Sequence, residues 1–194
     1  MTAGSERREW FDLATVVREL LVVKVAEAEL RGLRVDVVLA SAPVQADHRL
    51  IELMVVNLLD NAIRHNVAPG GIEVVTGWTG AHAFLSIAND GAKVPPEEID
   101  RLFEPFQRLG AERTNQGEGF GLGLCIVEAV ANSQGAILST RAREPGGLSL
   151  QVDFPEGEDG DDESVATIGS PTQTVEATVT DDWTEANQRG RVAP

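Results

Sequence analysis

Apolar residues recur at helical spacing in four parts of the chain, and particular residues mark where the helices begin and end. Asp47 can act as an N-cap, Gly32 stops the first helix, and Gly135 closes the last. The expected helices cover residues 14–31, 47–65, about 96–102 and 122–131. The second of them is apolar almost all round, which predicts that it is largely buried.

Alternating apolar and polar residues predict five strands between and after these helices. The expected strands cover residues 34–40, 72–78, 83–88, 136–141 and 148–154. This order of helices and strands is typical of an α+β protein. We therefore expect a two-layer sandwich in which the helices cover one face of a mixed sheet.

The negative charge of the chain is concentrated near its C-terminus. The formal net charge is -15, and residues 156–194 contribute -8 of it through ten Asp/Glu against two Arg. A segment of this composition buries too little apolar area to offset its ordering entropy, so we expect 156–194 to be a disordered acidic tail. The expected organisation is a short lead over 1–10, one domain over 11–155, and this tail. No basic stripe is present, so no nucleic-acid partner is expected.

Cysteine content and hydropathy restrict the expected compartment. The single cysteine, Cys125, excludes a disulfide within the chain and a zinc site built from cysteines. No stretch reaches the roughly 18 apolar residues that span a bilayer. We therefore expect a cytoplasmic domain with no membrane contact of its own. Any position at the inner face of the membrane would come from a partner or from a missing N-terminal part.

A stripe of polar residues interrupts the second helix. Asn57, Asn61, Arg64 and His65 stand at positions i, i+4, i+7 and i+8, which share one face of a helix. One interpretation is that they are paired core amides or a solvent-exposed stripe. The other is a nucleotide pocket, in which an amide oxygen binds Mg²⁺ and Arg64 contacts a phosphate.

Glycines at alternate positions lead directly into the third helix. Backbone N–H groups can approach oxygen atoms closely there, and the helix N-terminus attracts anions. The segment predicts a phosphate cradle, with a flexible hinge as the alternative, and its spacing fits neither a Walker loop nor a Rossmann fingerprint. Its residues are Gly117, Gly119, Gly121, Leu122, Gly123 and Leu124. A separate turn, Asn89 to Pro95, follows a predicted strand, and an amide or carboxylate there can contact the edge of a base.

Together these segments resemble the ATP-binding catalytic domain of bacterial sensor histidine kinases, relatives of the gyrase and mismatch-repair ATPases. The resemblance covers about residues 11–155 and depends on four motifs in the family's order. Asn57 to Asn66 resembles the N box, Asn89 to Pro95 the first glycine box, Arg101 to Phe106 the F box, and Gly117 to Leu124 the second glycine box. It implies the α+β Bergerat fold, with ATP and Mg²⁺ bound beneath a lid over about 107–118.

The resemblance also implies roles for the polar stripe. By this resemblance Asn61 is the Mg²⁺ ligand and Asn57 lies beside it, so that the two asparagines form the catalytic pair. Arg64 and His65 would reach the phosphates.

The first glycine box departs from the family pattern at two positions. Asn89 stands where the family usually has an aspartate that accepts a hydrogen bond from the adenine amino group, and Lys93 stands where it has glycine. Asn89 keeps an acceptor oxygen, so we expect adenine to bind at Asn89 and Gly91, more weakly by about 1 kcal/mol. Asp90 would take this role if the register differed by one residue.

The chain lacks the histidine segment that such kinases phosphorylate. In the related ATPases a glutamate at the position of Asn57 activates water, which an amide cannot do, so we expect slow hydrolysis and transfer of the phosphoryl group to a histidine. The expected acceptor is a separate or missing dimeric helical domain, contacted by Phe103 and Phe106, with a response regulator as an indirect partner. A protein serine kinase of the anti-sigma type and a nucleotide-sensing module without transfer activity are the alternatives.

Overall fold

The computed structural model describes residues 7–80, 82–106 and 121–155. The chain divides into two compact units, Met1–Glu158 and Asp159–Pro194, and the description below concerns the first. The predicted acidic tail over 156–194 and the predicted lid over 107–118 lie outside the described residues.

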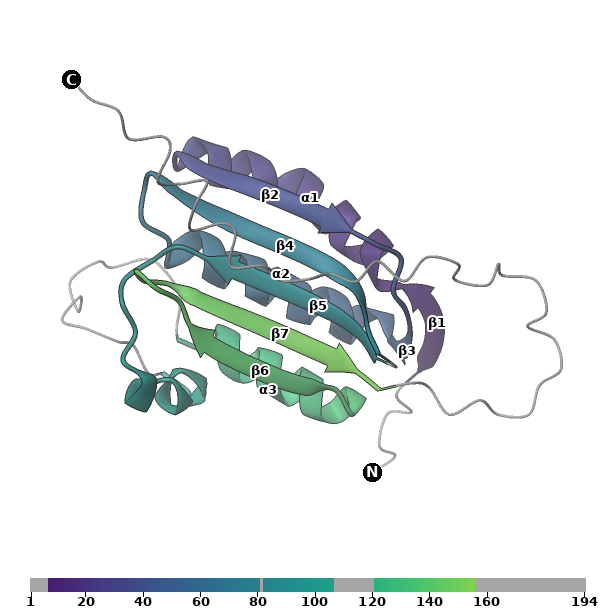
Figure 1. The fold of residues 1–194 in the computed structure, drawn as a ribbon. Helices are drawn as coiled ribbons and strands as arrows, with labels where there is room; N and C mark the ends of the chain where they lie inside the picture. The colour runs from purple at the N-terminus through teal and green to yellow at the C-terminus, as the bar shows by residue number, and fades with distance from the viewer. Residues whose placement is uncertain (1–6, 81, 107–120, 156–194) are drawn as a thin grey trace, which may run out of the picture. The chain divides into compact units, whose positions relative to one another are not determined.

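A five-stranded mixed sheet forms one layer of the domain, with strand order β2-β4-β5-β7-β6 (Figure 1). Its first pair is parallel and the other three pairs are antiparallel. The strands are β2 (Leu33–Leu39), β4 (Gly70–Thr79), β5 (His82–Asn89), β6 (Ile137–Ala142) and β7 (Leu148–Phe154). All five strands predicted from the sequence are present, with boundaries that differ by at most two residues.

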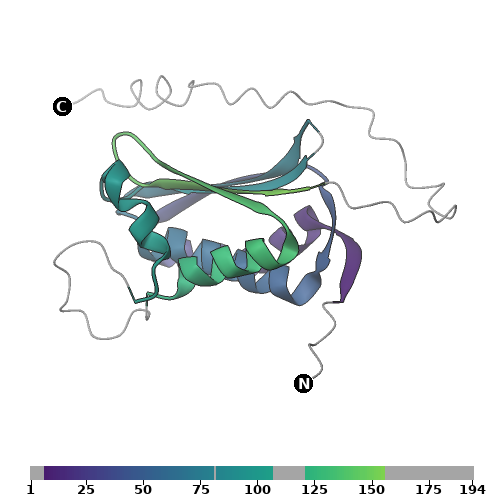
Figure 2. The same ribbon diagram turned by 90° about the horizontal axis from the view of Figure 1, so that it is seen from below.

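The helices form the second layer and cover one face of this sheet, as Figure 2 shows. They are α1 (Leu13–Leu30), α2 (His48–Arg64) and α3 (Gly123–Gln134), and the predicted short helix consists of two 3-10 turns, η1 (Pro96–Glu98) and η2 (Asp100–Phe103). The predicted α+β sandwich is therefore confirmed.

A small second sheet was not predicted. Strands β1 (Arg8–Asp12) and β3 (Pro43–Asp47) pair in antiparallel register, with Trp10 opposite Gln45. Each strand has only five residues; Arg8–Asp12 shows no alternation of apolar and polar positions, and the alternation of Pro43–Asp47 covers too few positions to predict a strand. The end of the predicted lead over 1–10 is thus part of a strand, because pairing with a segment more than 30 residues away supplies what local pattern does not.

Side-chain caps explain where two of the helices begin. Asp12 Oδ1 accepts hydrogen bonds from Ala14 N and from Ala42 N, both at 2.9 Å, and so joins the start of α1 to the loop before β3. Asp47, the predicted N-cap of α2, accepts from Arg49 N at 3.0 Å and Leu50 N at 3.3 Å. Such caps contribute about 0.5–2 kcal/mol each.

The core lies between the sheet and the inward faces of the helices. Burying a large apolar side chain contributes about 1.5–3 kcal/mol, so this layer supplies most of the stability of the domain. Its largest fully buried members include Leu13, Ile51, Met54, Leu58, Leu59, Ile72, Leu85, Ile87 and Leu150. None of the helices in the described part of the chain is long and apolar enough to cross a membrane.

An ion pair also joins α1 to α2. Lys24 Nζ donates to Asp60 Oδ1 across the two helices, and to Glu27 Oε2 at 3.2 Å within α1. Burial alone would lower the pKa of Lys24, but the hydrogen bonds to Asp60 and Glu27 more than compensate and raise it above its ordinary value. Lys24 therefore stays charged at neutral pH, and its hydrogen bond to Asp60 links the two helices.

Candidate nucleotide-binding site

The polar stripe of α2 faces away from the apolar core. Asn57 and Asn61 are half-buried, whereas Arg64 and His65 are exposed at the C-terminal end of the helix. Asn57 Nδ2 donates to Leu53 O at 2.7 Å, which leaves the acceptor Oδ1 available on the outer side. The helix is less fully buried than its sequence predicts, since Leu53 on this side is 43% exposed.

Asn61 carries a buried amide nitrogen without a hydrogen-bond partner among the described residues. An unpaired buried donor costs about 1–3 kcal/mol, and natural proteins contain few of them. A bound ligand can pair such an amide. Of the two interpretations of the stripe, this observation favours a binding site over paired core amides.

The start of α3 lies against Asn57. A Cβ atom on Gly123 would sit 3.4 Å from Asn57 Oδ1, so the first residue of α3 and the side chain of Asn57 lie close together. Leu122 stands at the N-cap and offers no side-chain acceptor, and Gly121 before it adopts a left-handed φ of 70°. The amide groups of the first turn thus keep the electropositive end of the helix available to an anion.

The side chain of Asn89 lies at the end of β5 and is buried, with 2% of its surface exposed. Its Nδ2 donates to Asp90 O at 2.7 Å, which fixes the orientation of the amide because only the nitrogen can donate to a carbonyl. Its Oδ1 then has no partner among the described residues. The unpaired atom is an acceptor, which is what an adenine amino group requires.

Asp90 has a different partner. Its Oδ2 accepts a hydrogen bond from Gly71 N at 2.7 Å, and its own N–H donates to Gly71 O at 3.0 Å. The carboxylate is thus used to join the end of β5 to the start of β4. This contact favours Asn89 over Asp90 as the residue that contacts a base.

Gly91 brings this loop against the end of α2. A Cβ atom at Gly91 would lie 2.6 Å from His65 O, closer than real Cβ atoms approach other atoms, so the position excludes any side chain. The turn after β5 and the C-terminal end of the polar stripe are therefore in contact. The predicted residues lie along one path, from Asn89 past α2 to the start of α3.

The remaining predicted site residues divide into two groups. Gly117 and Gly119 lie outside the described residues. Leu124 is buried in the core cluster with Val127 and Val130, so its side chain serves packing and only its backbone is near the start of α3. Its predicted contact with a ligand is therefore limited to main-chain atoms.

The two F-box phenylalanines have different environments. Phe103 packs against the hydrophobic core, whereas Phe106 is 72% exposed. Phe106 has a left-handed φ of 65°, and its N–H donates to Gly121 O at 3.0 Å. The F box is thus hydrogen-bonded to the glycine segment, and of the two rings only that of Phe106 is largely exposed.

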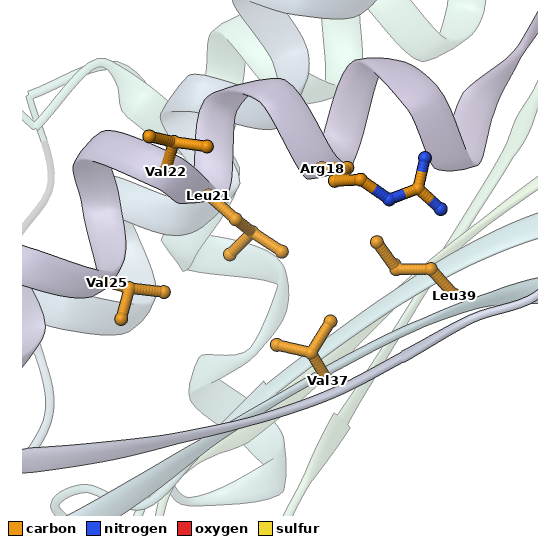
Figure 3. Close-up of a pocket in the computed structure, with 6 residues that line it drawn as sticks. All are labelled: Arg18, Leu21, Val22, Val25, Val37 and Leu39. Atoms are coloured by element: carbon orange, nitrogen blue, oxygen red, sulfur yellow. The ribbon is translucent and has the colours of Figure 1, made fainter.

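A separate apolar groove lies between α1 and β2, on the edge of the domain away from α3 (Figure 3). It has a volume of about 510 Å³, and its lining includes Val22, which is 75% exposed. The lining residues are Arg18, Leu21, Val22, Val25, Val37 and Leu39. None of them is a predicted site residue, so the groove is distinct from the polar site.

Sequence reasoning missed the glycines of the β6–β7 connection. No site role is predicted for Gly146 and Gly147 from the sequence, but both are buried against the turn that carries Asn89 and Gly91. The available signal was a Gly-Gly pair before a strand, which indicates a close approach of two backbones without saying which backbone is approached.

The sandwich, the polar stripe and the helix start opposite it define a nucleotide-binding domain. A family model described as histidine kinase-, DNA gyrase B-, and HSP90-like ATPase matches residues 46–158, and the chain belongs to this family. It contains the ATP-binding catalytic domain of the sensor histidine kinase type.

Relatives in sequence and structure agree with this assignment. The sensor protein CutS of Streptomyces coelicolor is 42% identical over 149 residues, which cover 76% of this chain and 36% of CutS. The mycobacterial sensor histidine kinase MprB has a TM-score of 0.64 at 26% identity, covering 77% of this chain and 97% of that structure. The catalytic domain of histidine kinase ThkA is similar in fold, with a TM-score of 0.67 at 24% identity over 77% of this chain and 96% of that structure. The chain thus spans about a third of the length of CutS.

Proposed function

We propose that this domain binds Mg²⁺-ATP between α2 and the start of α3 and transfers the γ-phosphoryl group to a histidine on a separate acceptor. One observation carries the proposal: Asn61 and Asn89 each keep a buried polar atom without a partner among the described residues, the donor Nδ2 of Asn61 on α2 and the acceptor Oδ1 of Asn89 after β5. The unpaired acceptor of Asn89 suits the adenine amino group. The amide oxygens of the stripe suit a hard cation.

Each residue of the site would contribute through its position. Asn61 would hold Mg²⁺, which neutralises phosphate charge when bound, with Asn57 Oδ1 beside it facing Gly123. Arg64, in the last turn of α2, would stabilise a phosphate, as would the N–H groups at the start of α3. Asn61 and the first turn of α3 hold the γ-phosphate in place, which is most of what phosphoryl transfer requires from a protein.

The nature of the residue at Asn57 favours transfer over hydrolysis. An amide cannot take a proton from water, so a phosphoryl acceptor that needs no such base has the advantage. A neutral imidazole is a phosphoryl acceptor of this kind. The bond between the γ-phosphorus and ADP breaks, a P–N bond to the imidazole forms, and the ring loses its proton to solvent. We place this reaction in the cytoplasm, where thiols such as that of Cys125 stay reduced.

Labelled ATP, Mg²⁺ and a dimeric helical domain that carries an acceptor histidine test the proposal. We expect acid-labile, base-stable label on the acceptor and none on this chain. The same acceptor with its histidine replaced by glutamine serves as the control and should stay unlabelled. Label on this chain alone, or acid-stable phosphoserine on the acceptor, would contradict the assignment and support a serine kinase. Absence of any label despite ATP binding would support a nucleotide-sensing module.

Asn89→Leu is expected to lower ATP affinity about tenfold, because the replaced side chain has no acceptor for the adenine amino group. The stability of the nucleotide-free protein should change little, since the substitution removes both the hydrogen bond to Asp90 O and an unpaired buried acceptor. Calorimetric titration with Mg²⁺-ATP and a thermal melt measure the two effects. An unchanged affinity would exclude Asn89 from the site.

A further inference from the structure

The β6–β7 hairpin packs its two glycines directly on the backbone of the turn after β5. A Cβ atom on Gly147 would lie 2.0 Å from Asn89 O, and one on Gly146 would lie 2.4 Å from Gly91 O. Real Cβ atoms essentially never come within 3.0 Å of other atoms, so backbone touches backbone at both positions. A side chain at either glycine would displace the turn.

Hydrogen bonds hold the two segments in this contact. Gly147 N donates to Ala92 O at 3.0 Å, and Leu148, the next residue, pairs with Asn89 in the sheet. An ion pair between Lys93 Nζ and Glu144 Oε1, at 3.0 Å, joins the same turn and hairpin at the surface. The backbone is thus fixed on both sides of Asn89, by the sheet before it and by the hairpin after it.

We propose that Gly146 and Gly147 are positioning residues that determine the preference of the site for a purine with a 6-amino group. The proposal rests on the proposed nucleotide site at Asn89. The Asn89 amide hydrogen-bonds to Asp90 O, a carbonyl of the same turn, so the direction of Asn89 Oδ1 follows the backbone of that turn. The glycine contacts fix that backbone. They therefore determine where the acceptor points.

A hydrogen bond is sensitive to displacement on the scale that a methyl group would cause here. A Cβ atom at Gly147 must move away from Asn89 O by at least about 1 Å to reach a tolerable contact. A shift of that size takes an acceptor out of hydrogen-bond range. Contacts to the phosphates come from α2 and α3 and do not depend on the hairpin. Substitution of either glycine should therefore reduce selectivity for the base more than it reduces affinity for the triphosphate.

The affinities for ATP and for purine riboside triphosphate, which lacks the 6-amino group, test this proposal. In the wild type, calorimetry with Mg²⁺ should give about tenfold tighter binding of ATP. In Gly147→Ala and in Gly146→Ala that ratio should fall to about twofold. Gly146 lacks a positive φ, so its variant keeps the test valid even if Gly147→Ala, at a φ of 102°, does not fold.

Gly80→Ala is the matched control. Gly80 also has a positive φ, of 64°, but no atom lies within 4 Å of the added Cβ, so its variant has backbone strain without the contact. It should keep the tenfold ratio. A folded Gly146→Ala that keeps the wild-type ratio would overturn the positioning role and leave the nucleotide site intact. A wild type that fails to bind ATP, or binds both nucleotides equally, would instead overturn the assignment of Asn89 on which the proposal rests.

Discussion

Asn61→Ala is expected to abolish Mg²⁺-dependent ATP binding and phosphoryl transfer, with a loss of at least about 100-fold in the transfer rate. The substitution removes the only side chain that we propose as a direct protein ligand of Mg²⁺, and with it the charge neutralisation that positions the γ-phosphate. The nucleotide-free protein should be as stable as the wild type or more so. The variant loses a buried, unpaired nitrogen, and alanine is the better helix former. A gain of about 1 kcal/mol corresponds to an increase of roughly 2–4 °C in the melting temperature.

A variant that loses ATP binding but keeps or gains stability identifies Asn61 as a functional residue. Replacing a residue with a purely structural role would lower binding and stability together. The matched control is Asn132→Ala, which makes the same chemical change at an exposed position on α3. Asn132→Ala should leave ATP binding and its dependence on Mg²⁺ unchanged. Wild-type Mg²⁺ dependence in Asn61→Ala would refute the metal assignment, and a lower melting temperature in the absence of nucleotide would show that the amide has an unrecognised partner.

Asn57→Glu is expected to raise ATP hydrolysis about 10- to 100-fold above a very slow wild-type rate. The acceptor oxygen of Asn57 faces Gly123 at the start of α3, where the phosphates are proposed to bind. A carboxylate there can accept a proton from water, and a well-placed general base accelerates such reactions by about 10² to 10⁴. We expect less than the full effect, because the substitution adds a base without adding a group that orients the water.

Asn57→Gln separates basicity from side-chain length. Glutamine has the shape and length of glutamate but cannot act as a base. The Asn57→Gln variant should therefore hydrolyse ATP at a rate near that of the wild type. Release of inorganic phosphate, measured for the three proteins at saturating Mg²⁺-ATP, gives the comparison. Equal rates in the glutamate and glutamine variants would show that Asn57 does not face the attacking water. Fast hydrolysis by the wild type would contradict the preference for transfer.

The groove between α1 and β2 differs from the polar site of α2 in its chemistry. The lining of this groove is aliphatic apart from Arg18. ATP is a polyanion, and aliphatic side chains offer its phosphates no hydrogen bonds. We therefore propose the nucleotide site at the polar stripe of α2, from the chemistry of its side chains, and not at this groove.

Local sequence determined the main helices and the strands of the large sheet. Helical periodicity, strict alternation and the residues Asp47 and Gly135 act within a few positions of themselves, and the structure places the elements where these signals predict. The order of the four motifs likewise indicated the family. The polar stripe of α2 needed only the geometry of one helix.

Only the tertiary structure decided which distant residues meet. Asn57 and Gly123 are 66 positions apart, and Asn89 and Gly147 are 58 apart, yet each pair is in contact. The pairing of β1 with β3, the packing of Phe103 on the core and the hydrogen bond of Asp90 with Gly71 are likewise contacts between separate segments of the chain. A local pattern records how a segment presents its own faces, but a contact between segments depends on how all the layers pack at once. For that reason the sequence predicted the polar residues of the proposed site, and the fold alone showed which of them keep an unpaired atom.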